Sequence, residues 1–159
     1  MATVLPISLS CTVIDANVMV ALCAKEPHRY VMLAAEIEKY AQAGNLFYTP
    51  NIIVGESLYA LRRKLTEGVL DVTEHVQAVQ SLRVRMTAIL PPPGGEASLI
   101  LRADQICNGY GYSRSADALY IALAEELSRT YTTRLLTFDQ GLPKQAAQNA
   151  PLVSVHLLT

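Results

Sequence analysis

Carboxylates that directly follow apolar runs are the residues of this sequence best suited to chemistry. Asp15 follows Val13-Ile14, and Asp139 follows the run Leu135–Phe138. Both runs are typical of buried strands, and ligands of parallel α/β sheets bind beyond the carboxyl ends of the strands. We therefore expect both acids to point into one crevice. Taken singly, helix capping by Asp15 and a turn at Asp139-Gln140-Gly141 explain the two residues equally well.

Asp117 is a third acid in an unusual setting. On a helix that begins near Ala116, it shares one stripe with the apolar residues Tyr120, Ile121 and Ala124. An acid on an apolar stripe is not a residue of the solvent-facing side. The structural alternative, a favourable interaction with the helix dipole, would not require this face of the helix. We therefore favour a functional role for Asp117.

Glu56 lies on a helix expected from Pro50 to Glu67. We expect the core side of this helix to consist of Val54, Leu58, Leu61 and Leu65. Glu56 lies on the opposite side, together with Ile52, Tyr59 and Arg63. That side is either solvent or the wall of a cleft, and the residues alone favour a solvated glutamate.

The placement of the aspartates suggests the kind of chemistry. Three of the five aspartates of the chain occupy these strand-end or apolar-stripe positions. Carboxylates gathered in one cleft repel one another, so they are protonated in part or held by a cation. Oxygen ligands of this kind select Mg²⁺ or Mn²⁺, which activates water and neutralises charge on a phosphate during in-line displacement. Without a paired His or a nucleophilic Ser or Cys, this chemistry fits better than acyl transfer.

Strands and helices alternate along the chain and must position these acids. We expect strands at Cys11–Ile14, Leu46–Thr49, Thr87–Leu90, Arg134–Phe138 and Leu152–Leu157. Helices are expected at Asn17–Ala24, Pro27–Gly44, Pro50–Glu67, Thr73–Met86, Glu96–Asn108, from Ser113 or Ser115 to Arg129, and from Pro143. This alternation predicts an α/β fold of three layers, with a mainly parallel central sheet flanked by helices.

The composition of the chain limits its domain organisation, its partners and its cellular setting. The 159 residues are 51% hydrophobic and 17% charged, which predicts one domain over residues 1–159 and excludes disorder. A net charge of −1 excludes a protein that coats nucleic acid by bulk charge, so any polyanion must be met locally. Three cysteines without Cys-x-x-Cys spacing indicate a reducing, cytoplasmic setting. The single charge among residues 1–24, Asp15, makes a membrane span there unfavourable.

Four fragments of the sequence together resemble the PIN domain family. They are VIDANV at 13–18, NIIVGESL at 51–58, SADALYIALA at 115–124 and LTFD at 136–139, and they occur in the order of the family. The resemblance implies a PIN-like fold over nearly the whole chain. It also implies a Mg²⁺- or Mn²⁺-dependent ribonuclease, often the toxin of a toxin–antitoxin pair of the VapC kind.

The resemblance assigns roles to particular residues. Asp15, Glu56, Asp117 and Asp139 form the acidic, metal-binding and catalytic pocket, and Asn17 and Thr137 resemble the polar residues that support it. Glu56, a surface residue by pattern alone, thereby becomes a metal-site acid. The usual assembly of such proteins is a homodimer, and an antitoxin is the implied partner.

The resulting hypothesis is an endoribonuclease that cleaves RNA by metal-activated water. Because acids repel RNA, basic residues must lie nearby, and the candidates are Arg62, Arg63, Lys64 and Arg114. Tyr110 and Tyr112 are candidates for stacking on unpaired bases.

Three other functions compete with this hypothesis. A PIN-like module that binds RNA or protein without catalysis stays open. A phosphatase of the haloacid dehalogenase kind needs a second aspartate where Asn17 stands. A dinucleotide-binding protein needs a Gly-x-Gly-x-x-Gly motif after the first strand, and the sequence lacks one there.

Overall fold

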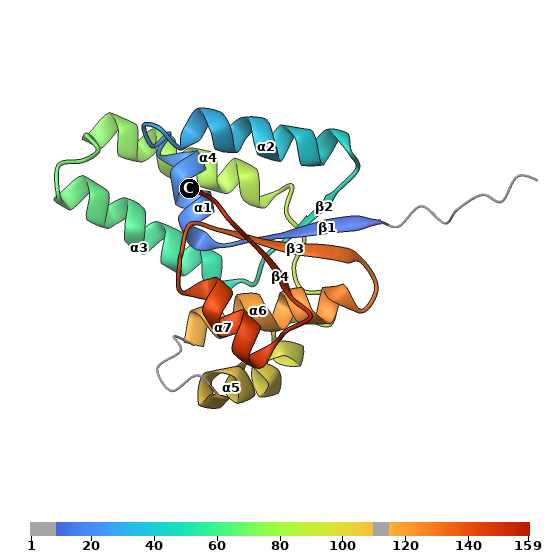
Figure 1. The fold of residues 1–159 in the computed structure, drawn as a ribbon. Coiled ribbons are helices and arrows are strands. Elements are labelled where there is room, and N and C mark those ends of the chain that lie inside the picture. The colour runs from blue at the N-terminus through green and yellow to red at the C-terminus, as the bar shows by residue number, and fades with distance from the viewer. Residues whose placement is uncertain (1–8, 110–114) are drawn as a thin grey trace, which may run out of the picture.

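The computed structural model describes residues 9–109 and 115–159, which form a sheet between two groups of helices (Figure 1). The strands of the described residues are β1 (Ser10–Ile14), β2 (Leu46–Tyr48), β3 (Thr132–Thr137) and β4 (Ser154–Leu157). Their order in the sheet is β2-β1-β3-β4, and each neighbouring pair is parallel. The predicted α/β class with its central parallel sheet is confirmed.

The two central strands end side by side. Ile14 of β1 is paired with Leu136 of β3, and the backbone N–H of Asp15 donates to the carbonyl of Leu136 at 3.2 Å. Because the strands are parallel, the segments that follow them leave the sheet at the same edge. Asp15 and Asp139 therefore begin from neighbouring positions, although 124 positions separate them in the sequence.

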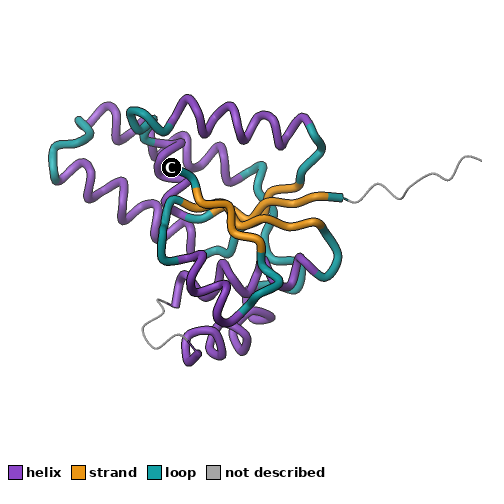
Figure 2. Tube along the Cα trace, in the orientation of Figure 1, coloured by secondary structure: helices purple, strands orange, loops and turns teal. Residues whose placement is uncertain are grey.

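The helices cover both faces of the sheet. They are α1 (Ala16–Cys23), α2 (Tyr30–Gln42), α3 (Ile52–Thr66), α4 (Val72–Met86), α5 (Ile100–Gly109), α6 (Ser115–Ser128) and α7 (Leu142–Asn149), with a 3-10 turn, η1 (Glu96–Leu99). Helices α1 to α4, labelled in Figure 1, gather on one side of the strands, and α5 to α7 lie on the other side, as the same view in Figure 2 shows. The sheet with its two helical layers is the predicted three-layer arrangement.

Helix α6 is the central helix of the second layer. Its residues Ala118, Tyr120, Ile121, Leu123 and Ala124 have no exposed surface. The helix packs against both β1 and β3, and α5 covers its other side. A helix that is apolar almost all round is buried in this way, and it holds its first turn rigidly beside the ends of the central strands.

The predicted strand Thr87–Leu90 is wrong. Only Leu90 pairs with the sheet, through an isolated bridge to Tyr48. The N–H groups of Thr87 and Ala88 instead bond back to the last turn of α4. The following residues Pro91–Pro93 have no N–H to donate, so a ladder cannot continue past Leu90.

The predicted core side of α3 is also wrong in part. Leu61 is buried as expected, but Val54 and Leu58 are 38% and 42% exposed. Ile53 and Ser57 are buried instead. The buried stripe is therefore rotated by about one residue, and it includes a polar residue, Ser57, that a search for an apolar stripe does not find.

Smaller differences concern helix boundaries. Helix α2 begins at Tyr30 instead of Pro27, after a turn, and the segment expected to be helical from Glu96 begins as η1. Ser113, one of the two proposed starts of α6, lies outside the described residues. Among the helices that the structure describes, none has the length and apolar character needed to cross a membrane.

Candidate active site

The four predicted acids line one cleft. Asp15, Glu56, Asp117 and Asp139 all contribute to a cleft of about 540 Å³ at the end of the central strands. They come from the end of β1, from α3, from the first turn of α6 and from the segment after β3. Four segments far apart in the sequence thus bring carboxylates to one place.

Asp15 is held by two polar side chains. The hydroxyl of Thr137 donates to Oδ2 of Asp15 at 2.6 Å, and Nδ2 of Asn17 donates to the same oxygen at 2.8 Å. Oδ1 of Asn17 accepts a hydrogen bond from the backbone N–H of Phe138 at 3.0 Å. The side chain of Asn17 therefore joins the start of α1 to the segment that follows β3.

The same network reaches Asp139. Its backbone N–H donates to the hydroxyl oxygen of Thr137 at 2.9 Å, while its own Oδ1 accepts from the N–H of Gly141 at 2.7 Å. The turn expected at Asp139-Gln140-Gly141 is thus present, and it also directs the carboxylate into the cleft. Asp15, in contrast, occupies the N-cap position of α1 without making a capping hydrogen bond.

Burial and neighbouring charges act on the Asp15 carboxyl. Burial raises the pKa of Asp15 to about 6, and the hydrogen bond from Thr137 offsets only part of this effect. The negative charges of Asp117 and Glu56 contribute a smaller part of the same increase. Without a cation, the ionised form of Asp15 is therefore costly at neutral pH.

Asp117 is positioned from two helices. It lies in the first turn of α6, above the buried residues Tyr120, Ile121 and Ala124 that were predicted to share its stripe. Nε2 of Gln145, on α7, donates to Oδ2 of Asp117 at 2.9 Å. Gln145 itself is only 6% exposed, and its contact with Asp117 is partly buried. Sequence analysis did not identify Gln145, because no residue pattern in α7 indicates that this helix lies beside Asp117.

Glu56 is half-buried in the wall of the cleft and is not a solvated residue. The hydroxyl of Tyr120 donates to its Oε2 at 2.8 Å, across the boundary between α6 and α3. Burial, followed by the charges of Glu56 and Asp15, raises the pKa of Tyr120 far above its ordinary value, so the phenol keeps its proton. Sequence analysis placed Tyr120 in the core only. The rule that a buried tyrosine needs a hydrogen-bond partner is the signal that would have marked it.

The donor set of the cleft fits a hard divalent cation by its chemistry, because it offers carboxylate, amide and hydroxyl oxygens. Within residues 9–109 and 115–159, however, no three acidic, His or Cys side chains are grouped closely enough to hold an ion by themselves. Mg²⁺ commonly binds through one or two carboxylates and keeps several waters. The cleft therefore suits an ion held partly through water.

Basic side chains also line this cleft. Of the predicted RNA-binding residues, Arg63 and Lys64 line it, whereas Arg62 is exposed on α3 outside the lining. Arg29, which sequence analysis missed, lines it as well. The predicted contacts of Arg114, Tyr110 and Tyr112 fall on residues outside those that the structure describes.

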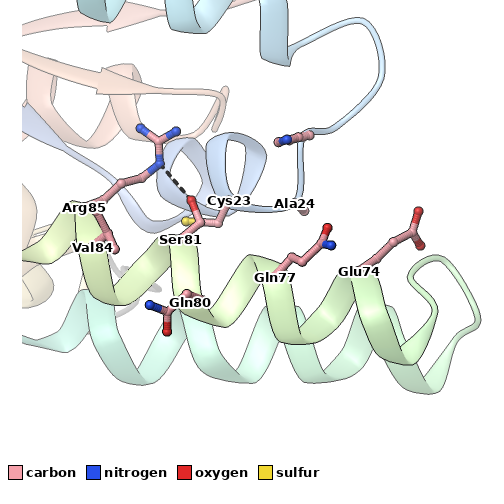
Figure 3. A pocket seen from close by; sticks show the side chains of 9 residues that line it. Cys23, Ala24, Glu74, Gln77, Gln80, Ser81, Val84 and Arg85 are labelled. Atoms are coloured by element: carbon pink, nitrogen blue, oxygen red, sulfur yellow. Dashed lines mark hydrogen bonds between the residues drawn. The ribbon is translucent and has the colours of Figure 1, made fainter.

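A second hollow, of about 820 Å³, lies at the end of α1 beside α4 (Figure 3). Arg85 donates from Nε to the hydroxyl of Ser81 at 3.2 Å there, near Cys23. Its one carboxylate, Glu74, closes the capping box at the start of α4 with Asp71. The four predicted acids thus meet in the first cleft and not in this larger hollow.

The fold and the site define an α/β protein with a carboxylate-lined cleft at the carboxyl ends of its parallel strands. Comparison with known proteins identifies its family. The sequence model of the PIN domain matches residues 12–148. The chain belongs to the PIN domain family. Proteins of this family are generally nucleases and typically use divalent metal ions.

Solved structures share the fold at low sequence identity. VapBC2 from Rickettsia felis, bound to a DNA fragment from its promoter, gives a TM-score of 0.63 at 14% identity, over 94% of this chain and 99% of that chain. FitAcB from Neisseria gonorrhoeae gives 0.55 at 18% identity, over 91% and 95%. PAE2754 from Pyrobaculum aerophilum gives 0.51 at 16% identity, over 91% and 81%. No match was found among curated proteins.

Proposed function

We propose that this protein is an endoribonuclease that depends on Mg²⁺ or Mn²⁺ and hydrolyses RNA phosphodiester bonds with water as the nucleophile. The observation that carries the proposal is the convergence of Asp15, Glu56, Asp117 and Asp139 in one cleft. When bound, the ion activates water and neutralises charge on the phosphate. Attack by water is expected to leave a 5′-phosphate and a 3′-hydroxyl.

In this proposal the four acids have two roles. Asp15, Asp117 and Asp139 hold the cation directly or through water, and Glu56 orients the attacking water. Thr137 and Asn17 are supporting residues, because both donate to Oδ2 of Asp15 and so fix its direction. The pKa of Asp15, raised to about 6, supports a cation at this position, since a cation would offset the cost of the buried negative charge.

The assembly is proposed on similarity. VapBC2 and FitAcB share the fold of this chain, which supports an antitoxin as the partner and a toxin role for the nuclease. A single domain over residues 1–159 and a cytoplasmic location remain predictions from the sequence, and a homodimer remains a prediction from the family resemblance. Basic residues Arg62, Arg63, Lys64 and Arg114 are proposed to attract the RNA.

A second candidate is a PIN-like module that binds RNA or protein without turnover. It is favoured by one observation: within the described ranges, no three acidic, His or Cys side chains are close enough together to hold an ion. In this case the acids would serve only to position the ends of the strands and helices.

One experiment separates the two candidates. Purified protein is incubated with single-stranded RNA in Mg²⁺, in Mn²⁺ and in EDTA, beside the variants Asp15→Asn and Asp117→Asn. A matched control is Asp104→Asn, since Asp104 is exposed on α5 and lies outside the cleft. The nuclease proposal expects cleavage with metal by the wild type and the control only. Cleavage that persists in EDTA or in both cleft variants overturns it, and RNA binding without cleavage supports the second candidate.

A further inference from the structure

Arg29 lies beside the acids although it belongs to the segment between α1 and α2. Its guanidinium lies 4.4 Å from the centre of the Phe138 ring, over the face of that ring. Phe138 stands between Thr137 and Asp139, so the contact fixes Arg29 next to the ends of the central strands. The side chain remains 48% exposed, and it lines the acidic cleft.

Glu26 connects Arg29 to a second cation. Its Oε2 accepts from Nη1 of Arg29 at 3.1 Å, and its Oε1 lies 2.7 Å from Nζ of Lys64 on α3. One carboxylate thus holds two cations in the lining of the cleft, and this group of three carries a net positive charge. Glu26 itself is only 17% exposed, which makes it a firm support for both cations.

The backbone around Glu26 is unusual. Lys25 and His28 have φ values of 49° and 68°, in the left-handed region that residues other than glycine seldom adopt. These two positions bracket Glu26. Backbone in sparsely populated regions concentrates at binding sites and switches, where the surrounding structure maintains it. Here it accompanies the ion pairs that hold Arg29 and Lys64 at the cleft.

The positive charge of Arg29 and Lys64 can offset the repulsion between the cleft and a nucleic acid. The four acids of the cleft repel a polyanion, and a cation bound there would offset that repulsion only at the phosphate it contacts. A strand that crosses the cleft must place its neighbouring phosphates against other positive groups. Arginine is suited to this, because its planar fork of donors matches a phosphate.

We propose that Arg29 and Lys64, held by Glu26, form a phosphate-binding subsite for the nucleotide adjacent to the bond that is cleaved. The proposal rests on the proposed function for its substrate, a single-stranded nucleic acid. Arg29 supplies a guanidinium on a half-exposed side chain, and its contacts with Phe138 and Glu26 hold it at the cleft. Arg29 is therefore a binding residue and not a metal ligand.

The test measures RNA binding without cleavage. A short, fluorescently labelled single-stranded RNA is titrated in EDTA over a series of KCl concentrations. We expect Arg29→Ala to weaken binding about three- to tenfold and to reduce the slope of log K against log salt by about 0.7, the value of one phosphate contact on a single strand. Arg29→Lys keeps the charge, so it is expected to keep the slope and to recover part of the affinity.

Arg83→Ala is the matched control, because Arg83 is an exposed arginine on α4 outside the cleft. It should leave the slope unchanged. The proposal is overturned if the wild type does not bind the RNA or if Arg29→Ala binds like the wild type. It is also overturned if Arg29→Ala and the control Arg83→Ala lose affinity equally. Binding and cleavage are measured separately. A protein that never cleaves RNA but loses affinity with Arg29→Ala therefore refutes the nuclease, and it still supports phosphate binding by Arg29 beside the acidic cleft.

Discussion

The hydroxyl of Tyr120 and Oε2 of Glu56 are joined by a hydrogen bond of 2.8 Å that links α6 to α3. Tyr120 has no exposed surface, whereas Glu56 is half-buried at the cleft. A rigid, buried phenol thus directs one oxygen of a carboxylate on a neighbouring helix. In the proposed reaction this contact decides how Glu56 orients water.

Tyr120→Phe removes that single donor and keeps the ring in the core. We expect kcat for RNA cleavage to fall about tenfold with KM unchanged, which is the order of effect seen when a partner of a metal-site group is lost. The free energy of unfolding is expected to fall by about 1.5–3 kcal/mol, the range for a hydrogen bond to a charged group. Steady-state kinetics and urea unfolding measure the two effects.

Tyr30→Phe is the control for this prediction, since Tyr30 begins α2 and lies outside the cleft lining. It should leave kcat unchanged. If Tyr120→Phe loses stability but keeps kcat within about twofold, the hydrogen bond is structural only.

Asp15 makes the stability of the metal-free protein depend on pH. Its pKa rises from 3.8 to about 6 in the folded state, so the folded protein favours the protonated form. This contribution to stability is complete below the unfolded pKa of 3.8 and is lost as pH rises through about 6. A shift of about two pKa units corresponds to about 3 kcal/mol.

Asp15→Asn should remove this dependence. We expect the variant to be more stable than the wild type by about 2–3 kcal/mol at pH 8 in EDTA, with the difference shrinking toward pH 4. Oδ1 of asparagine still accepts from Thr137, so the local packing is retained. Urea unfolding across this pH range gives the comparison. A difference that is constant with pH contradicts the assignment to Asp15.

Metal binding should reverse the cost of ionised Asp15. At pH 8 we expect Mg²⁺ or Mn²⁺ to raise the melting temperature of the wild type, because a ligand that binds only the folded state stabilises it by about 2.7 kcal/mol at a hundredfold excess over Kd. EDTA should abolish the increase. Thermal unfolding followed by circular dichroism measures it without any need for turnover. An equal increase for Asp15→Asn would place the ion elsewhere.

The elements that carry the acids could be predicted because their signals are local. The run before Asp15 is β-branched and the run before Asp139 is apolar, and both indicate buried strands. Asp117 stands out on the apolar stripe of α6. The parallel arrangement then follows from the alternation of strands and helices. The sequence alone therefore allowed us to predict that these three acids converge.

Which side of α3 faces the core could not be predicted from the sequence. Apolar residues occur around much of this helix, so periodicity alone did not identify which of them pack inward, and Val54 and Leu58 turned out to be exposed. The side that faces the core depends on contacts with α1 and α4, which the sequence of α3 does not encode locally. For the same reason Glu56 was identified only through the family resemblance.

Two residues that line the cleft or contact its acids, Arg29 and Gln145, could not be predicted from the sequence either. Arg29 lies near Asp139 only because the turn after α1 brings it over Phe138. Gln145 meets Asp117 only because α7 folds back beside α6. Neither residue shares a spacing pattern with the acid that it approaches, so only tertiary structure brings each pair together.

Gln145 provides the last prediction, because it holds Asp117 from a helix that carries none of the acids. Gln145→Met keeps the volume of the side chain but removes its amide donor, so Oδ2 of Asp117 loses a buried partner. We expect Mn²⁺ affinity, measured by calorimetry, to fall about tenfold or more, the cost of losing an outer partner of a metal ligand. Gln148→Met on the same helix is the control, because Gln148 is exposed and donates to the carbonyl of Gly109 instead. Equal Mn²⁺ affinities for the two variants would mean that Gln145 stabilises only the packing of α7 and does not position Asp117.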